Sequence, residues 1–338
     1  MQNIFDYDLK SLCSRFAELN IPKFRAKQVF LWLHKKLVFD FSLMSDLPLE
    51  LREVLSQNFA IGLPRIIKTF KSKDKTIKFL FGLSDGTRIE SVLLKSSDGR
   101  FTICVSTQVG CPLACAFCAT GQSGFKRNLT ASEIIGQVYL ITKNFPGVTN
   151  IVYMGMGEPF LNYANVVKSI NVLISKEGLN FGQRKISIST SGIPEKIRIF
   201  AAEDWQVRLA VSLNSADERI RSRLMPINKK IPLSRIKDAI KYYISRTGRR
   251  VTLEYIMIKD VNDTPDALVS LLDFCQGLLV NVNLIPFNSI GGSFKASEIK
   301  TVNLFLRTLI NNKINVNLRN RRGEDIQAAC GQLAFKPL

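Results

Sequence analysis

From about residue 100 onward, short runs rich in β-branched and other apolar residues alternate with longer segments of helical periodicity. The runs that predict strands are TICVS (102–106), NIVYMG (150–155), KISIST (185–190), VRLAVSL (207–213), VTLEYIMI (251–258) and VNVNLIPF (280–287). A parallel strand returns to the same edge of a sheet only through a long crossover, which the helical segments supply. Six strand–helix units of this kind predict an α/β fold whose parallel strands form a partial or complete barrel.

Two of the intervening helices have recognisable start signals. One begins at Thr130, where Glu133 completes a capping-box pattern three residues later. Another begins at Thr264, with Pro265 in the first helical position. After the sixth unit, a last predicted strand, INVNLRN (314–320), leads into the segment QAACGQL.

The first 70 residues have helical periodicity and no strand pattern. Apolar residues recur at helical spacing in two stretches: Leu9, Leu12, Phe16 and Leu19, followed by Phe24, Val29, Trp32 and Leu33. Pro48 starts a third, short helix. Residues 1–70 are therefore predicted to form a helical accessory module. Its basic residues either cover a solvated helix face or contact RNA: Lys23, Arg25, Lys27, Lys35 and Lys36.

A hairpin pattern separates this module from the barrel. TIKFLF (76–81) and RIESVLL (88–94) alternate with period two around a turn that contains Asp85 and Gly86. Residues 71–100 are thus predicted to form a β-hairpin extension, and residues 101–338 the barrel with its C-terminal segment.

The charge balance indicates a polyanionic partner. Lys and Arg total 47 against 28 Asp and Glu, a formal net charge of +19. Basic side chains on phosphates release condensed counterions, so this excess favours nucleic acid, although a generally basic proteome would produce the same excess.

The composition also bears on the compartment. No apolar run approaches the roughly 18 residues of a membrane-spanning helix, and the start MQNIFDYDLKSLCSRF lacks the apolar core of a secretory signal. We therefore expect a cytoplasmic protein with no membrane contact, in which thiols stay reduced. Seven cysteines in that compartment indicate metal ligands or catalytic groups more than a disulfide framework.

Three of these cysteines lie directly after the first barrel strand. Cys111, Cys115 and Cys118 have the spacing C-x₃-C-x₂-C, and soft thiolates of this kind suit an iron–sulfur cluster or zinc. A structural zinc site normally has four ligands, but no fourth cysteine lies nearby and His34 is the only histidine. A [4Fe–4S] cluster held by three thiolates leaves one iron open to another ligand. The alternative is three core cysteines that fall close together by chance.

This cysteine motif, with Phe117 before its last cysteine, resembles the signature of radical-SAM enzymes. The resemblance implies a partial (β/α)₆ barrel in which Cys111, Cys115 and Cys118 bind three irons of a [4Fe–4S] cluster. The open iron would chelate S-adenosylmethionine (SAM), and one-electron reduction would generate a 5′-deoxyadenosyl radical.

Further segments narrow the resemblance to one family. They are QVGCPLACAFCATGQSGFKRNLTASEIIGQV, YMGMGEP, STSG, MPINKK, EYIMIKDVND, NLIPFN and DIQAACGQL. A weaker similarity extends to FRAKQVFLWLHKK in the helical module. In this order they resemble the dual-specificity methyltransferases that act on adenine C2 in 23S rRNA and, next to the anticodon, in tRNA. The resemblance implies these RNAs as partners, a flavodoxin-type electron donor and a monomeric enzyme.

The resemblance also implies a set of SAM contacts, all near the carboxyl ends of predicted strands, where barrel active sites form. They are Gly157, Glu158, Ser189, Ser212, Leu213, Asn214 and Asn288. Many members have His where this chain has Asn214, which can still donate and accept hydrogen bonds.

Two cysteines outside the cluster motif match catalytic positions of the family. Cys330 would accept a methyl group from a first SAM, and a second SAM would supply the radical that activates this methyl group for addition to C2. Cys104 would then attack the Cys330 sulfur, release the product and leave a disulfide. Glu90 matches the proton-accepting position; without the resemblance we would read it as part of a solvated strand face. Cys13 and Cys275 match no motif and are interpreted as structural.

Three other functions remain as alternatives. The first is methylation of C8 of the same rRNA adenine, which shares the cysteines, although Pro159 and the STSG and NLIPFN segments fit the C2 group better. The second is a non-catalytic RNA-binding protein with a structural metal site, which gives no role to Cys104 and Cys330. The third is an activase for a glycyl-radical enzyme, which would not need Cys330.

Overall fold

Ten strands of the described residues, 1–96 and 98–334, form one continuous sheet in this computed structural model. Seven neighbouring strands are parallel and follow chain order, and they are β6 (Phe101–Cys104), β9 (Val148–Tyr153), β10 (Ile186–Thr190), β11 (Arg208–Ser212), β12 (Val251–Met257), β13 (Val280–Pro286) and β14 (Asn315–Leu318). All seven coincide with strands predicted from the sequence. The first and last strands in the sheet order, β14 and β3, are not paired with each other. The predicted partial barrel is therefore confirmed.

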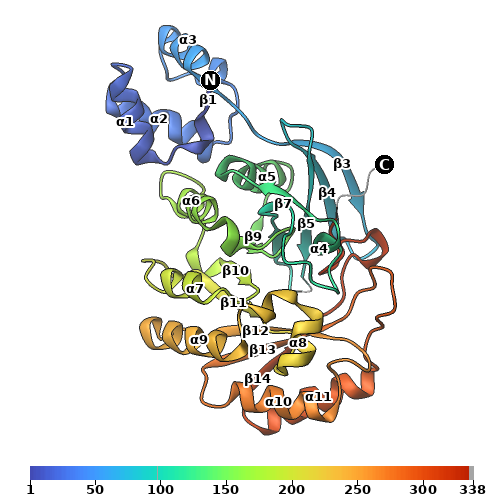
Figure 1. Cartoon of the computed structure of the whole chain (residues 1–338). Coiled ribbons are helices and arrows are strands. Elements are labelled where there is room, and N and C mark those ends of the chain that lie inside the picture. The colour runs from blue at the N-terminus through green and yellow to red at the C-terminus, as the bar shows by residue number, and fades with distance from the viewer. Residues whose placement is uncertain (97, 335–338) are drawn as a thin grey trace.

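The crossovers between these strands contain helices that cover the outside of the sheet (Figure 1). They are α5 (Ala131–Asn144), α6 (Tyr163–Ile174), α7 (Pro194–Phe200), α8 (Glu218–Leu224), α9 (Leu233–Thr247), α10 (Pro265–Cys275) and α11 (Ile299–Asn311). The capping box of Thr130 and Glu133 is formed at the start of α5, and the Thr264 hydroxyl accepts a hydrogen bond from the Ala267 amide at the start of α10. Both predicted helix starts are confirmed.

The hairpin extension has one more strand than predicted. β4 (Ile77–Gly82) and β5 (Arg88–Lys95) pair antiparallel, and β5 continues the sheet by pairing antiparallel with β6. β3 (Arg65–Lys71) pairs with the other side of β4. The prediction that residues 65–70 belong to the helical module is therefore wrong. This strand reads RIIKTFK, and its charged residues suit an exposed sheet edge but hide the period-two pattern.

The N-terminal module contains three helices, α1 (Leu9–Glu18), α2 (Lys23–His34) and α3 (Leu49–Asn58), and a short parallel pair, β1 (Gln2–Asn3) with β2 (Phe59–Ala60). The module packs against α5 of the barrel. There, His34 Nδ1 lies 2.6 Å from the hydroxyl of Tyr139. His34 is fully buried, and burial lowers its pKa to about 3.

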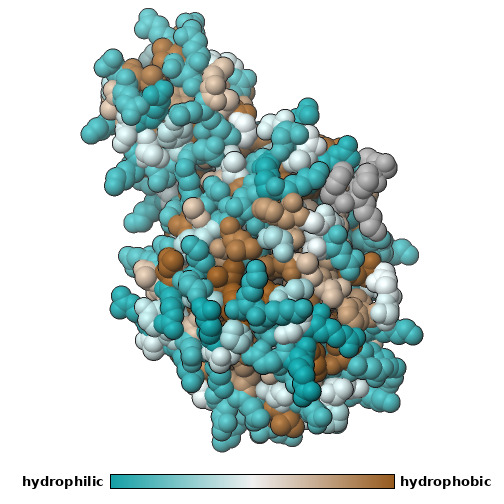
Figure 2. Space-filling model, viewed as in Figure 1, coloured by the Kyte–Doolittle hydropathy of each residue, from teal (hydrophilic) through white to brown (hydrophobic). Residues whose placement is uncertain are grey.

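Surface properties differ between the two parts of the molecule. Figure 2 shows apolar residues gathered in the middle of the barrel on this face, whereas the helical module is mostly hydrophilic.

Phe24, which the helical spacing placed in the apolar stripe, is 59% exposed, and the Arg25 guanidinium lies 4.8 Å from its ring centroid. No helix in the described part of the chain is long and apolar enough to cross a lipid bilayer.

Candidate active site

The three clustered cysteines lie in a loop whose two ends are paired to each other. β7 (Gln108–Gly110) precedes the loop and pairs antiparallel with β8 (Phe125–Asn128), which follows it, and a short helix, α4 (Ala119–Gln122), lies between. Gly110 has a positive φ of 79°, and a Cβ there would collide with the carbonyl oxygen of Gly124. A glycine is therefore required where the chain enters the loop.

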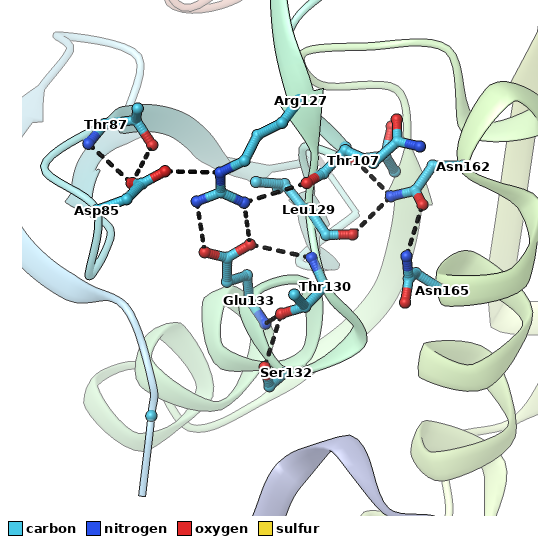
Figure 3. Close-up of polar contacts among 12 residues, drawn as sticks. Asp85, Thr87, Thr107, Arg127, Leu129, Thr130, Ser132, Glu133, Asn162 and Asn165 are labelled. Carbon is cyan, nitrogen blue, oxygen red and sulfur yellow. Dashed lines mark hydrogen bonds and ion pairs between the residues drawn. The ribbon is translucent and has the colours of Figure 1, made fainter. Parts of the chain in front are cut away.

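A polar network attaches this loop to the hairpin and to α5 (Figure 3). Arg127 of β8 donates to Asp85 in the β4–β5 turn at 2.7 Å and binds both carboxylate oxygens of Glu133 at 2.7 and 2.8 Å. The side-chain amide of Asn162 donates to the carbonyl oxygens of Thr107 and Leu129, one on each side of the loop. These contacts fix the position of the loop relative to the barrel.

The cysteine loop and the strand ends enclose a cavity, termed here the first cavity. Of the residues predicted as a site, it brings together Cys111, Cys115, Cys118, Gly157, Glu158, Ser189, Ser212, Asn214 and Cys330. Ser189 is the next-to-last residue of β10 and Ser212 the last residue of neighbouring β11, and their hydroxyl oxygens are 3.3 Å apart. Residues distant in the sequence thus meet at the carboxyl ends of the strands.

A second cavity shares part of its lining with the first. It contains Cys104, Cys118, Asn288, Arg319 and Cys330. Of the cysteines, Cys118 and Cys330 line both cavities, whereas Cys104 lines only the second. Cys330 therefore lies at the junction between the two cavities.

Two predicted SAM contacts lie elsewhere. Leu213 is fully buried and is not among the described residues that line either cavity. Asn288 lines the second cavity and not the first. Its side-chain amide donates a hydrogen bond to the carbonyl oxygen of Cys330 at 3.2 Å.

The turn after β9 positions an acidic side chain in the first cavity. Gly157 has a φ of 100°, and a Cβ there would come within 2.5 Å of the Gln108 side chain. The buried carboxylate of Glu158 accepts hydrogen bonds from the backbone amides of Phe160 at 3.0 Å and Ser191 at 2.7 Å. Burial raises the pKa of Glu158 above its usual value, and these hydrogen bonds offset only part of the increase.

Asn214 adopts a positive φ of 57° that Asn tolerates better than most residues. Its carbonyl side-chain oxygen accepts a hydrogen bond from the Ile256 amide at 3.1 Å, and its amide lies 3.3 Å from the Met225 sulfur. The side chain therefore connects the end of β11 to β12 at the edge of the first cavity.

The donor groups around the first cavity suit an iron–sulfur cluster and a polar ligand. Burial raises the pKa of the Cys111 thiol to about 12 and raises that of Cys115 as well, so a metal would be needed to hold them as thiolates. The Ser191 hydroxyl and Glu254 Oε2 line this cavity and have no hydrogen-bond partner among the described residues. Among the described residues, no three Cys, His, Asp or Glu side chains are arranged to hold a single metal ion. A four-iron cluster, in which each thiolate binds a different iron, does not require that arrangement.

Sequence reasoning missed Arg319, which follows β14 and lines both cavities. Its pKa is raised above the usual value, first by the nearby Cys330 thiol and then by Glu254 and Cys104. Burial raises the pKa of the Cys104 thiol to about 12, and Arg319 opposes this increase. Arg319 therefore places a positive charge beside both candidate catalytic cysteines. Its position in the run NLRN, at the end of a predicted strand, was the available signal.

The environment of Glu90 was also not predicted. Glu90 is 6% exposed, so the reading as a solvated strand face is wrong. Its carboxylate lies 2.9 Å from the ammonium group of Lys78 and accepts a hydrogen bond from the Ala334 amide at 3.1 Å. A lone lysine in a strand gave no sign of this buried ion pair.

Two family models match the chain. Residues 105–273 match the radical SAM superfamily. Residues 2–61 match the N-terminal domain of ribosomal RNA large subunit methyltransferases. The two matches correspond to the barrel and to the helical module.

Similar proteins span nearly the whole chain. A probable dual-specificity RNA methyltransferase RlmN of Pseudothermotoga lettingae is 46% identical over 99% of this chain and 98% of its own length. The protein of the same name from Thermosipho melanesiensis is 45% identical over the full length of both chains. A radical SAM methyltransferase from Sphaerobacter thermophilus, of known crystal structure, is 40% identical, with a TM-score of 0.94 over 98% of this chain and 99% of that one. The chain therefore belongs to the RlmN-type dual-specificity RNA methyltransferases of the radical-SAM superfamily, which implies a [4Fe–4S] cluster and SAM as its cofactors.

Proposed function

We propose that this enzyme methylates C2 of an adenine in 23S rRNA and, next to the anticodon, in tRNA, with Cys330 as the methyl carrier. One observation carries this proposal: Cys330 lies at the junction of the two cavities, beside the cluster cysteines in one and beside Cys104 in the other. A carrier must reach the methyl donor in one place and the target base in another. The first cavity would hold the cluster and SAM, and the second would hold the adenine.

The need for a carrier follows from the chemistry of the base. C2 of adenine is electron-poor and its hydrogen is not acidic, so a direct polar transfer from SAM has no nucleophile to attack. Cys330 would take the methyl group from one SAM as a thioether. When bound, the cluster and a second SAM supply the radical that removes hydrogen from this methyl group. Two SAM molecules are therefore proposed for each turnover.

The later steps are assigned to residues of the second cavity and the hairpin. The activated methylene on Cys330 would form a bond to C2, and Glu90 would accept the proton that leaves this carbon. The electron lost with that proton would return to the cluster, which would have given up one electron to generate the radical. Cys104, as a thiolate, would attack the Cys330 sulfur and form a disulfide, and the released carbon would take up a proton to become the methyl group. Arg319 supports both thiolate steps because it lies beside both cysteines.

The remaining cofactor contacts are proposed by motif and position. Gly157, Glu158, Ser189, Ser212 and Asn214 line the first cavity and would contact SAM directly. Leu213 would contact SAM only through its backbone, since its side chain is buried. Asn288 lines the second cavity, so its Oδ1, which has no hydrogen-bond partner among the described residues, would reach only the part of SAM that extends toward the adenine site.

Partners and domain roles are proposed on general grounds. Residues 1–64 would contact RNA through exposed basic side chains such as Lys23, Lys27 and Lys35. A flavodoxin-type donor would supply single electrons to the cluster, and the enzyme would act as a monomer in the cytoplasm, where its free cysteines stay reduced.

Mass spectrometry of nucleosides tests the proposal most directly. Anaerobically reconstituted enzyme would be incubated with SAM, a low-potential reductant and an rRNA or tRNA fragment, and the RNA then digested. We expect 2-methyladenosine from both RNAs. A product of 8-methyladenosine would replace the proposal with the C8 alternative, and iron-free protein that only binds RNA would support the non-catalytic alternative.

A further inference from the structure

A buried ion pair joins two strands of the hairpin extension. Lys78 of β4 and Glu90 of β5 lie diagonally on one face of the antiparallel pair, because Glu90 is opposite Leu80. Their charged groups are 2.9 Å apart, and their side chains are 9% and 8% exposed. Desolvation makes a buried ion pair costly unless its remaining hydrogen-bonding capacity is also used.

Both members of the pair use that capacity on the segment that carries Cys330. The Lys78 ammonium donates a hydrogen bond to the carbonyl oxygen of Gln327 at 3.3 Å, three residues before Cys330. The Glu90 carboxylate accepts one from the amide of Ala334 at 3.1 Å, four residues after it. The ion pair therefore contacts the segment on both sides of the carrier cysteine.

Four other described hydrogen bonds hold residues 327–334 against the barrel. Asn288 donates to the carbonyl oxygen of Cys330, and Gln332 donates to the carbonyl oxygen of Ser289 at 2.8 Å. The Thr120 hydroxyl and the Ala119 amide donate to the carbonyl oxygens of Leu333 and Gly331. All of these come from the barrel, whereas Lys78 and Glu90 make the described hydrogen bonds from the hairpin to this segment.

We propose that Lys78 is a positioning residue, which holds residues 327–334 so that the Cys330 sulfur faces the methyl donor. This inference rests on the proposed role of Cys330 as carrier. It gives the hairpin a function in methyl loading, a step that precedes any proton transfer to Glu90. The same pair places the proposed base beside the segment that delivers the methylene.

Three single variants test the role of Lys78. Lys78→Met removes the charge and the donor but keeps an unbranched side chain, whereas Lys78→Arg keeps both. Lys68→Met is the matched control, because Lys68 lies on neighbouring β3, and its ammonium, like that of Lys78, is about 5 Å from the Phe70 ring. Lys68 is exposed and makes no contact with residues 327–334 among the described hydrogen bonds.

Two measurements would be made on each reconstituted enzyme. Hydrogen exchange of the peptide that contains residues 327–334 reports the position of the segment without any reaction. Mass spectrometry of the Cys330 peptide after incubation with SAM reports methyl loading. For Lys78→Met we expect faster exchange and about tenfold slower loading, since this variant cannot form the hydrogen bond from a charged group. Lys78→Arg and Lys68→Met should stay close to the wild type in both.

A further variant guards against loss of folding. Lys78→Met leaves Glu90 buried without its partner, and this alone could unfold the hairpin. The double variant Lys78→Met/Glu90→Leu replaces the pair by apolar side chains, which restores stability but not the contacts to Gln327 and Ala334. We expect this variant to bind iron like the wild type and still to load Cys330 slowly.

The outcomes separate this inference from the proposed function. If the double variant and Lys78→Met load Cys330 at the wild-type rate with unchanged exchange, Lys78 has no positioning role, although the carrier mechanism stands. If wild-type Cys330 is never methylated, the carrier mechanism fails, and the exchange measurement alone still decides whether Lys78 holds the segment.

Discussion

The side-chain amide of Asn288 donates a hydrogen bond to the backbone carbonyl of Cys330, at 3.2 Å. Asn288 follows β13 in the barrel, whereas Cys330 lies in the segment after β14. The contact fixes the backbone of the proposed carrier against the end of a strand. The Asn288 Oδ1 has no hydrogen-bond partner in the described part of the chain, and Asn288 lines the second cavity.

The proposed division of labour between the two catalytic cysteines predicts that their alanine variants fail at different steps. Cys330→Ala has no place to store the methyl group, so it should release unmodified RNA. Cys104→Ala can load Cys330 and bond it to adenine, but it cannot break the thioether. We expect a covalent protein–RNA adduct, visible as a slow band in denaturing electrophoresis that nuclease shortens and thiol reductants leave intact. Normal turnover by Cys104→Ala would contradict the mechanism.

If the three clustered cysteines bind the iron–sulfur cluster, replacing any one of them should abolish both iron binding and SAM cleavage. Cys111→Ala, Cys115→Ala and Cys118→Ala should each lose the iron and all SAM cleavage, because two thiolates do not hold the cluster securely. Iron content and visible absorption measure the first effect, and chromatography of the SAM cleavage products measures the second. Cys275→Ala is the control, since Cys275 is buried in α10 away from both cavities. A cluster variant with full iron and full activity would overturn the assignment.

The basic residues of the helical module predict a salt-dependent contribution to RNA binding. Lys23 and Lys27 are exposed and Arg25 is half-buried at the start of α2. Replacing all three by alanine should reduce the slope of log Kd against log salt concentration by up to about 3, roughly one for each phosphate that the variant no longer neutralises. Filter binding at several salt concentrations measures the slope. An unchanged slope would mean that this face of the module does not contact RNA.

Because His34 is buried, we expect the stability of the fold to depend on pH below about 6.5, a range in which few carboxylates titrate. Its pKa is lowered from 6.5 to about 3 in the folded protein, so below pH 6.5 only the unfolded chain takes up the proton. The free energy of unfolding should therefore fall by up to about 1.4 kcal/mol per pH unit as the pH drops toward 5. Denaturant unfolding at several pH values measures this dependence. Because His34 is the only histidine, His34→Gln should nearly remove it.

Removal of the Arg127 side chain should destabilise the fold more than removal of an exposed arginine. Arg127→Ala leaves the mostly buried Glu133 carboxylate without its bidentate partner, and we expect a loss of about 2 kcal/mol. Arg235→Ala, which breaks an exposed ion pair with Glu195, should change stability by less than about 0.5 kcal/mol. Thermal unfolding of the two variants compares them. Equal effects would show that the network in Figure 3 contributes no more than a surface ion pair.

The success of sequence-based prediction depended on how strongly each element is buried. Barrel strands such as β12 are buried on both faces and have long apolar runs, so their positions were predicted closely. β3 is an edge strand with mostly exposed side chains, and its pattern gave no signal. The module helices were predicted, but the exposure of Phe24 was not, because spacing alone does not show which apolar residue pairs with a neighbouring cation.

The candidate site divides in the same way. Cys111, Cys115 and Cys118 are close in the sequence, so their spacing predicted a shared site. Arg319 and Lys78 are single charged residues in or near strands, and such residues normally face solvent. Only the three-dimensional structure shows that one lies beside Cys104 and Cys330 and the other beside Glu90. Asn288 was expected at SAM by motif, yet its hydrogen bond to Cys330 depends on a fold that brings two distant segments together.

The contact between Lys78 and the carbonyl oxygen of Gln327 joins positions 249 residues apart. The ribosome makes the chain from the N-terminus, so the hairpin, the cysteine loop and most of the barrel emerge well before residues 327–334. Closing so long a loop is slow and has to await the last segment. A nascent chain can therefore complete the cysteine loop before the segment with the proposed methyl carrier has been made. Docking of residues 327–334, and with them the proposed carrier Cys330, therefore has to follow synthesis of the hairpin that receives them.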